Sequence, residues 1–198
     1  LEYLLKNSNK DHPKIVAFES VYSMDGDFAP IKKIIEVSKK YNALTYLDEV
    51  HGVGLYGKNG GGLSEQLGLT SEIDIIEGTL AKGFGLMGGY ITAKSNIIDV
   101  IRSFAPGFIF TTSLPPSLAA AAVASIRFVK NNHSLREALY ERADKLKKLM
   151  LAHNLPIIKN NSHIVPLLVK DPVRCKEISD ILLNDYSIYV QPINYPTV

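Results

Sequence analysis

The sequence predicts an α/β protein, in which a largely parallel β-sheet carries helices on its faces. The first indication is a pattern: short apolar runs rich in β-branched residues alternate with amphipathic stretches of helical periodicity. The second is composition, because 46% apolar and 21% charged residues are ordinary for a globular protein. A chain of 198 residues is long enough for one sizeable domain and part of another.

Four short strands are expected in the first half of the chain, each an apolar run of strand length. They are Lys14–Glu19, Ala43–Leu47, Ile73–Glu77 and Gly89–Ala93. Between the first two, Pro30 is placed to open a helix that runs to Tyr41. The apolar residues of this stretch recur at helical spacing and form one side of the predicted helix.

The middle of the chain is predicted to be mostly helical. Ser95–Phe104, Pro115–Lys130 and Leu135–His153 are predicted as helices, the last of them a long connecting helix with charges between its apolar positions. Phe108–Thr111 is predicted as a brief extended segment between the first two.

The last part of the chain is expected to begin a second domain. Ile164–Val169 and Ile188–Val190 are predicted strands on either side of a helix over Pro172–Leu183. With the boundary near Asn154, residues 1–154 form part of a large domain, and residues 155–198 begin a small α+β domain. Because the chain starts with leucine and ends without a helix stop or polar tail, we expect it to be a fragment of a longer protein.

Composition argues against several classes of protein. The formal net charge is only +2 and the charges are interspersed, so no basic stripe for nucleic acid is expected. The single cysteine, Cys175, can form neither an intrachain disulfide nor a zinc site by itself, which favours a reducing compartment: cytoplasm in a bacterium, mitochondrial matrix in a eukaryote. No apolar stretch reaches membrane-spanning length, so no membrane association is expected.

Lys82 is the strongest candidate for chemistry. It is flanked by small residues directly after a predicted strand, and Asp48 and His51 follow the preceding strand. In open α/β sheets ligands gather beyond the carboxyl ends of the strands, so these three side chains are expected to share one site. A lysine with acidic and imidazole partners suggests a Schiff base to an aromatic aldehyde cofactor.

Other interpretations of these segments remain open. Gly52–Gly57 and Gly83–Gly88 both satisfy the spacing of a dinucleotide-binding loop, and the first also imitates most of a phosphate-binding loop, with Asn59 in place of the usual Ser or Thr. Neither opens a helix, so flexible loops near a ligand are the better interpretation. Lys82 taken alone could be a surface charge, Asp48 a turn cap and His51 a core histidine.

Several longer motifs carry a resemblance to a known family. They occur in the same order along nearly the whole chain: Phe18–Asp27, Tyr46–Gly57, Gly78–Gly85, Arg102–Pro116 and Ile193–Val198. These segments resemble the α-oxoamine synthases, which are pyridoxal-phosphate enzymes of the aspartate aminotransferase fold (fold type I). One departure from the family is Gly83, where alanine is common. We expect glycine to make the backbone beside Lys82 more flexible without changing the chemistry of the lysine.

The resemblance implies roles for the cofactor-binding residues. Lys82 would be the catalytic lysine, bonded to pyridoxal 5'-phosphate and later moving a proton. Asp48 would face the pyridine nitrogen, while His51 and Ser23 would lie near the phenolic oxygen. Thr79 would bind the phosphate.

The resemblance also implies partners and an activity. Thr111 and Thr112 would reach the phosphate of the neighbouring subunit, making a homodimer with shared active sites, and Thr197 would lie beside the acyl-CoA substrate. The implied reaction condenses glycine with succinyl-CoA to an aminoketone, coenzyme A and carbon dioxide. Because other family sites lie outside this chain, it is expected to be inactive alone. A relative using another acyl-CoA, a non-catalytic scaffold and, more distantly, a nucleotide-binding module remain alternatives.

Overall fold

The computed structural model describes all residues from Leu1 to Val198. Its helices and strands follow in chain order: α1 (Glu2–Asn7), β1 (Ile15–Glu19), α2 (Ile31–Lys40), β2 (Leu44–Asp48), α3 (Leu63–Gln66), a 3₁₀ turn (Thr70–Glu72), β3 (Ile75–Thr79), β4 (Gly89–Ala93), α4 (Ser95–Phe104), α5 (Pro106–Ile109), α6 (Pro116–Asn131), α7 (His133–Ala152) and α8 (Pro172–Tyr186). The α/β class and the four strands of the first half are confirmed, with strand ends shifted by at most two residues.

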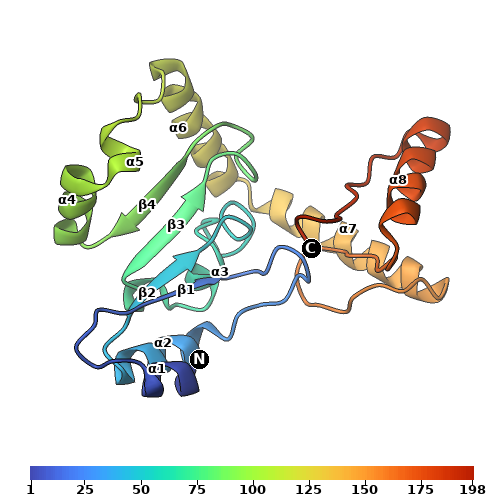
Figure 1. Ribbon diagram of the computed structural model, residues 1–198. Coiled ribbons are helices and arrows are strands. Elements are labelled where there is room, and N and C mark those ends of the chain that lie inside the picture. Colours follow the sequence, from blue (N-terminus) through green and yellow to red (C-terminus); the bar gives the residue numbers. More distant parts are fainter.

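The four strands form one sheet in the order β1-β2-β3-β4 (Figure 1). The first three are parallel and β4 runs antiparallel to β3, so the prediction of a largely parallel sheet is confirmed. The register pairs Glu19 with Asp48, and Asp48 with Glu77. Three acidic residues therefore lie side by side where β1, β2 and β3 approach their carboxyl ends.

One face of the sheet is packed and the other is open. Because side chains alternate between faces, Val16, Phe18 and Leu47 point into the main apolar core. Helix α2 covers this face, and its Ile31 and Ile35 are almost completely buried in the same core. On the opposite face the side chains of β1 and β2 are half-buried or exposed, which leaves their acidic ends accessible.

The prediction of an extended segment over Phe108–Thr111 is wrong. Proline at the first position opens the short helix α5, and the carbonyl of Ala105 accepts hydrogen bonds from the N–H groups of Phe108 and Ile109. A strand needs a neighbouring strand to satisfy its backbone groups, and this segment lies between helices α4 and α6 (Figure 1). The other helices of the middle of the chain are confirmed within about two residues.

The prediction of two strands near the C-terminus is also wrong. Ile164–Val169 forms only one isolated bridge, between Ile157 and Leu167, and Ile188–Val190 forms none. Their apolar runs have strand-like composition, but no neighbouring strand in these 198 residues pairs with them. The helix between them is confirmed as α8, whose first turn is capped by Asp171 through the Arg174 N–H at 2.7 Å. A second domain beginning near Asn154 stays a prediction.

None of the helices combines the length and the apolar composition needed to cross a membrane.

Candidate active site

Two loops meet at the carboxyl ends of β2 and β3 and bring Lys82 to His51. The Lys82 Nζ lies 2.6 Å from Nε2 of His51, within hydrogen-bonding distance. Lys82 is exposed and His51 is half-buried. Burial lowers the pKa of His51 and the positive charge of Lys82 lowers it further, while Glu19 and Asp48 oppose these effects. A neutral imidazole therefore accepts a hydrogen bond from the amine.

The loop that carries His51 is held by the buried carboxylate of Glu49. Glu49 has no solvent exposure, and its oxygens accept hydrogen bonds from Ser20 Oγ at 2.6 Å and from the N–H groups of Leu63 and Ser64 at 3.0 and 2.7 Å. The Glu49 carbonyl also accepts from the N–H of Gly52. The chain on either side of His51 is thus fixed from inside the protein.

Gly83 allows the Lys82 loop to approach the His51 loop closely. A Cβ atom at position 83 would lie 2.9 Å from the carbonyl oxygen of Val53, closer than real Cβ contacts come. The sequence suggested that glycine here adds backbone freedom. The structure gives it a second role, since the absent side chain makes room for the neighbouring loop.

The carboxylates beside this pair have clear local partners. Asp48 Oδ1 accepts from the Val50 N–H at 2.7 Å, so the turn-capping role is realised, and no hydrogen bond within the chain occupies Oδ2. Glu19 Oε2 accepts from the backbone N–H of Ser23 at 2.9 Å, which ties Ser23 to the same edge. Glu19 was not among the predicted site residues, although it ends a strand as Asp48 does, and that position at a strand end is the signal that could have found it.

Thr79 is the last residue of β3, three positions before Lys82. Its Oγ1 accepts from the Ala81 N–H at 3.0 Å and donates to the Gly88 carbonyl at 3.3 Å. The hydroxyl therefore stabilises the turn that leads into the lysine loop.

The remaining predicted residues do not join this cluster. Thr111 and Thr112 are exposed in the segment between α5 and α6 (Figure 1). Thr197 is exposed in the C-terminal turn, where its N–H bonds the Asn194 carbonyl at 2.9 Å. Their proposed roles involve a second subunit or a substrate and stay predictions.

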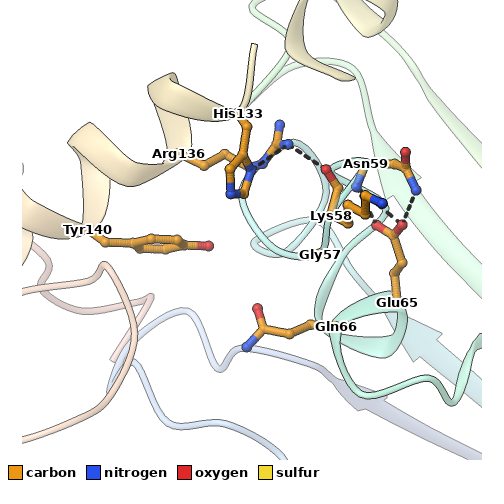
Figure 2. Close-up of a pocket in the computed structure, with 8 residues that line it drawn as sticks. All are labelled: Gly57, Lys58, Asn59, Glu65, Gln66, His133, Arg136 and Tyr140. Atoms are coloured by element: carbon orange, nitrogen blue, oxygen red, sulfur yellow. Dashed lines mark hydrogen bonds between the residues drawn. The ribbon is translucent and has the colours of Figure 1, made fainter. Parts of the chain in front are cut away.

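A pocket of about 390 Å³ lies on another side of the glycine-rich loop (Figure 2). Its polar groups are largely paired with one another: Glu65 accepts from Asn59 and Gly61, and the buried Arg136 donates to the carbonyls of Lys58 and Val129. These contacts fasten the loop to α7. The pocket contains none of the predicted site residues, and its internal pairing favours a structural role.

The structure also contains a pair, one residue buried and the other half-buried, that the sequence did not indicate. The hydroxyl of Tyr56, in the loop after His51, lies 2.9 Å from Nδ1 of His163. The two residues are 107 positions apart, so no local pattern could have joined them.

Residues 1–198 of the chain match the sequence model of the family "Aminotransferase class I and II". The chain is 54% identical over its whole length to 5-aminolevulinate synthase of Bradyrhizobium diazoefficiens and 56% identical to that of Rickettsia prowazekii. It covers 48% of each, so it spans about half the length of the curated relatives it matches.

Among solved structures, a serine palmitoyltransferase from S. paucimobilis, described with a bound PLP–myriocin aldimine, superimposes with a TM-score of 0.90 at 34% identity. The match covers 96% of this chain and 50% of that one. The aminotransferase-type fold predicted from the resemblance is confirmed.

Proposed function

Because this chain belongs to the class I and II aminotransferase family over all of its residues, we propose that it forms part of a pyridoxal-phosphate-dependent 5-aminolevulinate synthase. In the full-length protein it condenses glycine with succinyl-CoA, giving 5-aminolevulinate, coenzyme A and carbon dioxide, the first step of haem and tetrapyrrole synthesis. The observation that carries the proposal is the 2.6 Å contact between Lys82 and His51 beside the carboxylate of Asp48.

The donor set suits pyridoxal 5'-phosphate. A lysine amine can form an imine with its aldehyde. A carboxylate with one oxygen free of hydrogen bonds can pair with its protonated ring nitrogen, and a hydroxyl can donate a hydrogen bond to its phosphate. Lys82, Asp48 and Thr79 supply these groups at the ends of neighbouring strands. When bound, the cofactor supplies an electron sink for the substrate carbanion.

The residues of the chain then have separate tasks. Lys82 would hold the cofactor through Nζ and, as a free amine, would take the proton from the α-carbon of glycine. His51 and Ser23 would serve the phenolic oxygen, and the neutral His51 accepts a hydrogen bond without adding a second positive charge beside Lys82. Asp48 would keep the ring nitrogen protonated. Thr197 would contact the acyl-CoA.

We further propose a homodimer with shared active sites, in which Thr111 and Thr112 reach the phosphate bound by the partner. Large aromatic side chains next to them support an interface, since Phe104 and Phe110 are 76% and 87% exposed. We place the protein in the cytoplasm if it is bacterial.

Two other members of the family are the main rivals: 8-amino-7-oxononanoate synthase and 2-amino-3-ketobutyrate CoA ligase. Both would use the same lysine, carboxylate and imidazole, so the catalytic core does not separate them. The identity of 54–56% with two 5-aminolevulinate synthases favours succinyl-CoA. A non-catalytic scaffold is disfavoured, because it would need no imine-forming lysine.

The test is the absorption spectrum of the full-length protein with pyridoxal phosphate, compared with Lys82→Ala. We expect a visible band in the wild type that borohydride removes while attaching the cofactor to Lys82, and no such band in the variant. Glycine with succinyl-CoA should then yield 5-aminolevulinate in the wild type alone. The absence of any band that depends on Lys82 would refute the proposal and leave the scaffold.

A further inference from the structure

The buried Tyr56 and the half-buried His163 form a pair that joins two distant segments. Tyr56 is 3% exposed, and its ring packs against Phe28 with an edge-on geometry at 5.4 Å and against Tyr140 at 5.7 Å. Its hydroxyl accepts from the backbone N–H of His163 at 3.1 Å and lies 2.9 Å from Nδ1 of the same residue. A His163 ring protonated on Nε2 accepts the hydroxyl proton at Nδ1, and the other tautomer donates from Nδ1 to the hydroxyl oxygen; in both, one side-chain hydrogen bond joins the pair.

His163 stays neutral near pH 7, so its ring can take part in this hydrogen bond. Burial lowers its pKa to about 4, and the positive charge of Lys147 acts in the same direction.

Tyr56 is linked to His51 by a single turn of backbone. The N–H groups of Leu55 and Tyr56 both bond the carbonyl of Gly52, at 3.0 Å each, and Gly52 directly follows His51. A displacement of the Tyr56 ring would therefore be transmitted to the backbone of His51.

The segment that carries His163 is itself firmly held. Lys147 of α7 donates to Oδ1 of Asn160 at 2.9 Å and also bonds the Ser162 carbonyl. Asn160 in turn donates to the Asp25 carbonyl at 2.9 Å, and Ile164 packs against the main core. His163 therefore gives Tyr56 a hydrogen-bond partner in a segment that is itself held in place and lies outside the Tyr56 loop.

We propose that Tyr56 and His163 are positioning residues, which clamp the His51 loop to the segment around His163 and so maintain the contact between His51 and Lys82. The inference rests on the proposed function, since it assigns these residues a task in that active site. Neither residue touches the reacting atoms; both act through His51.

The test measures the titration of His51 by NMR in the cofactor-free, full-length protein, with His51→Gln to assign its signal. The variants are Tyr56→Phe, which keeps the ring and removes the hydroxyl, His163→Leu, which removes the ring nitrogen, and His163→Asn, whose amide can accept or donate in place of Nδ1. Tyr41→Phe is the matched control, because its hydroxyl bonds only the surface residue Glu2.

In Tyr56→Phe and His163→Leu we expect the pKa of His51 to rise by roughly half a pH unit or more, because a looser loop admits water and moves the imidazole away from Lys82. The acids Glu19 and Asp48 would then dominate its surroundings. His163→Asn and Tyr41→Phe should titrate like the wild type.

Equal titration of His51 in the wild type, Tyr56→Phe and His163→Leu would overturn the proposal, as would a shift in His163→Asn as large as in His163→Leu. A folding defect in one variant would still leave the other two to decide. Because cofactor and substrates are absent from this measurement, its failure is distinct from failure of the proposed reaction.

Discussion

The amine of Lys82 lies 2.6 Å from Nε2 of His51, although the two residues are 31 positions apart in the chain. The contact requires that the loops after β2 and β3 approach each other without intervening side chains, and glycine at position 83 allows this. It also requires an unprotonated Nε2, which the burial of His51 and the nearby positive charge of Lys82 both favour.

Asp48→Asn should lower the rate of 5-aminolevulinate formation by about 10²-fold or more, because an amide cannot keep a ring nitrogen protonated. The amide oxygen can still accept from the Val50 N–H, so the fold should persist. Steady-state kinetics of the full-length protein with unchanged circular dichroism would show this. Asp185→Asn, at an exposed position of α8, is the control. An Asp48→Asn enzyme with near wild-type turnover would contradict the assigned role.

Glu49→Ala should destabilise the protein by about 3 kcal/mol or more, because it leaves the hydroxyl of Ser20 and two backbone N–H groups buried without partners. Urea unfolding of the full-length protein measures the loss. The matched control is Glu36→Ala on the exposed face of α2, which should change stability little. Comparable unfolding midpoints for the two variants would show that the Glu49 contacts are not important.

Gly83→Ala should cost about 1–3 kcal/mol of stability, since its methyl group would press on the Val53 carbonyl. If the strain is relieved by separating the loops, binding of pyridoxal phosphate should weaken as well. Gly107→Ala is the control, because no atom lies within 4 Å of a Cβ built there. Urea unfolding and titration with pyridoxal phosphate of both variants test the prediction. A Gly83→Ala protein as stable as the wild type would show that the loops can move apart without loss of stability.

Stability should fall as the pH drops from about 6.5 to about 4, in part because of His163. Its pKa is lowered in the folded state to about 4 from an ordinary 6.5, so within this range the unfolded chain binds more protons. Stability therefore rises with pH through the window, and the contribution of His163 is complete above it. His163→Asn, which cannot be protonated, should flatten the dependence measured by urea unfolding at pH 7.5 and 5. An exposed-site control, His12→Asn, should retain the full decline; equal slopes for all three proteins would rule out this contribution.

Local sequence patterns indicated the strands of the first half, with Asp48 at the end of β2 and Lys82 shortly after β3. A short apolar run rich in β-branched residues and bounded by turn residues favours a buried strand over a helix, which would need a longer run. The same reasoning failed for Phe108–Thr111 and for the two C-terminal strands, because a strand also needs a neighbour, and a single run of residues does not reveal whether one is present.

The class of fold, the family motifs and the candidate chemistry of Lys82, Asp48 and His51 could be predicted from the sequence, since they depend on residue types and on spacings within short segments. Three contacts became visible only in the folded chain: Glu19 stands beside Asp48, Glu49 holds the His51 loop from within, and Tyr56 bonds His163. Each of these contacts joins segments far apart in the chain. Their formation depends on how loops pack over the sheet, and the packing of many side chains at once sets that arrangement, not a periodicity within one segment.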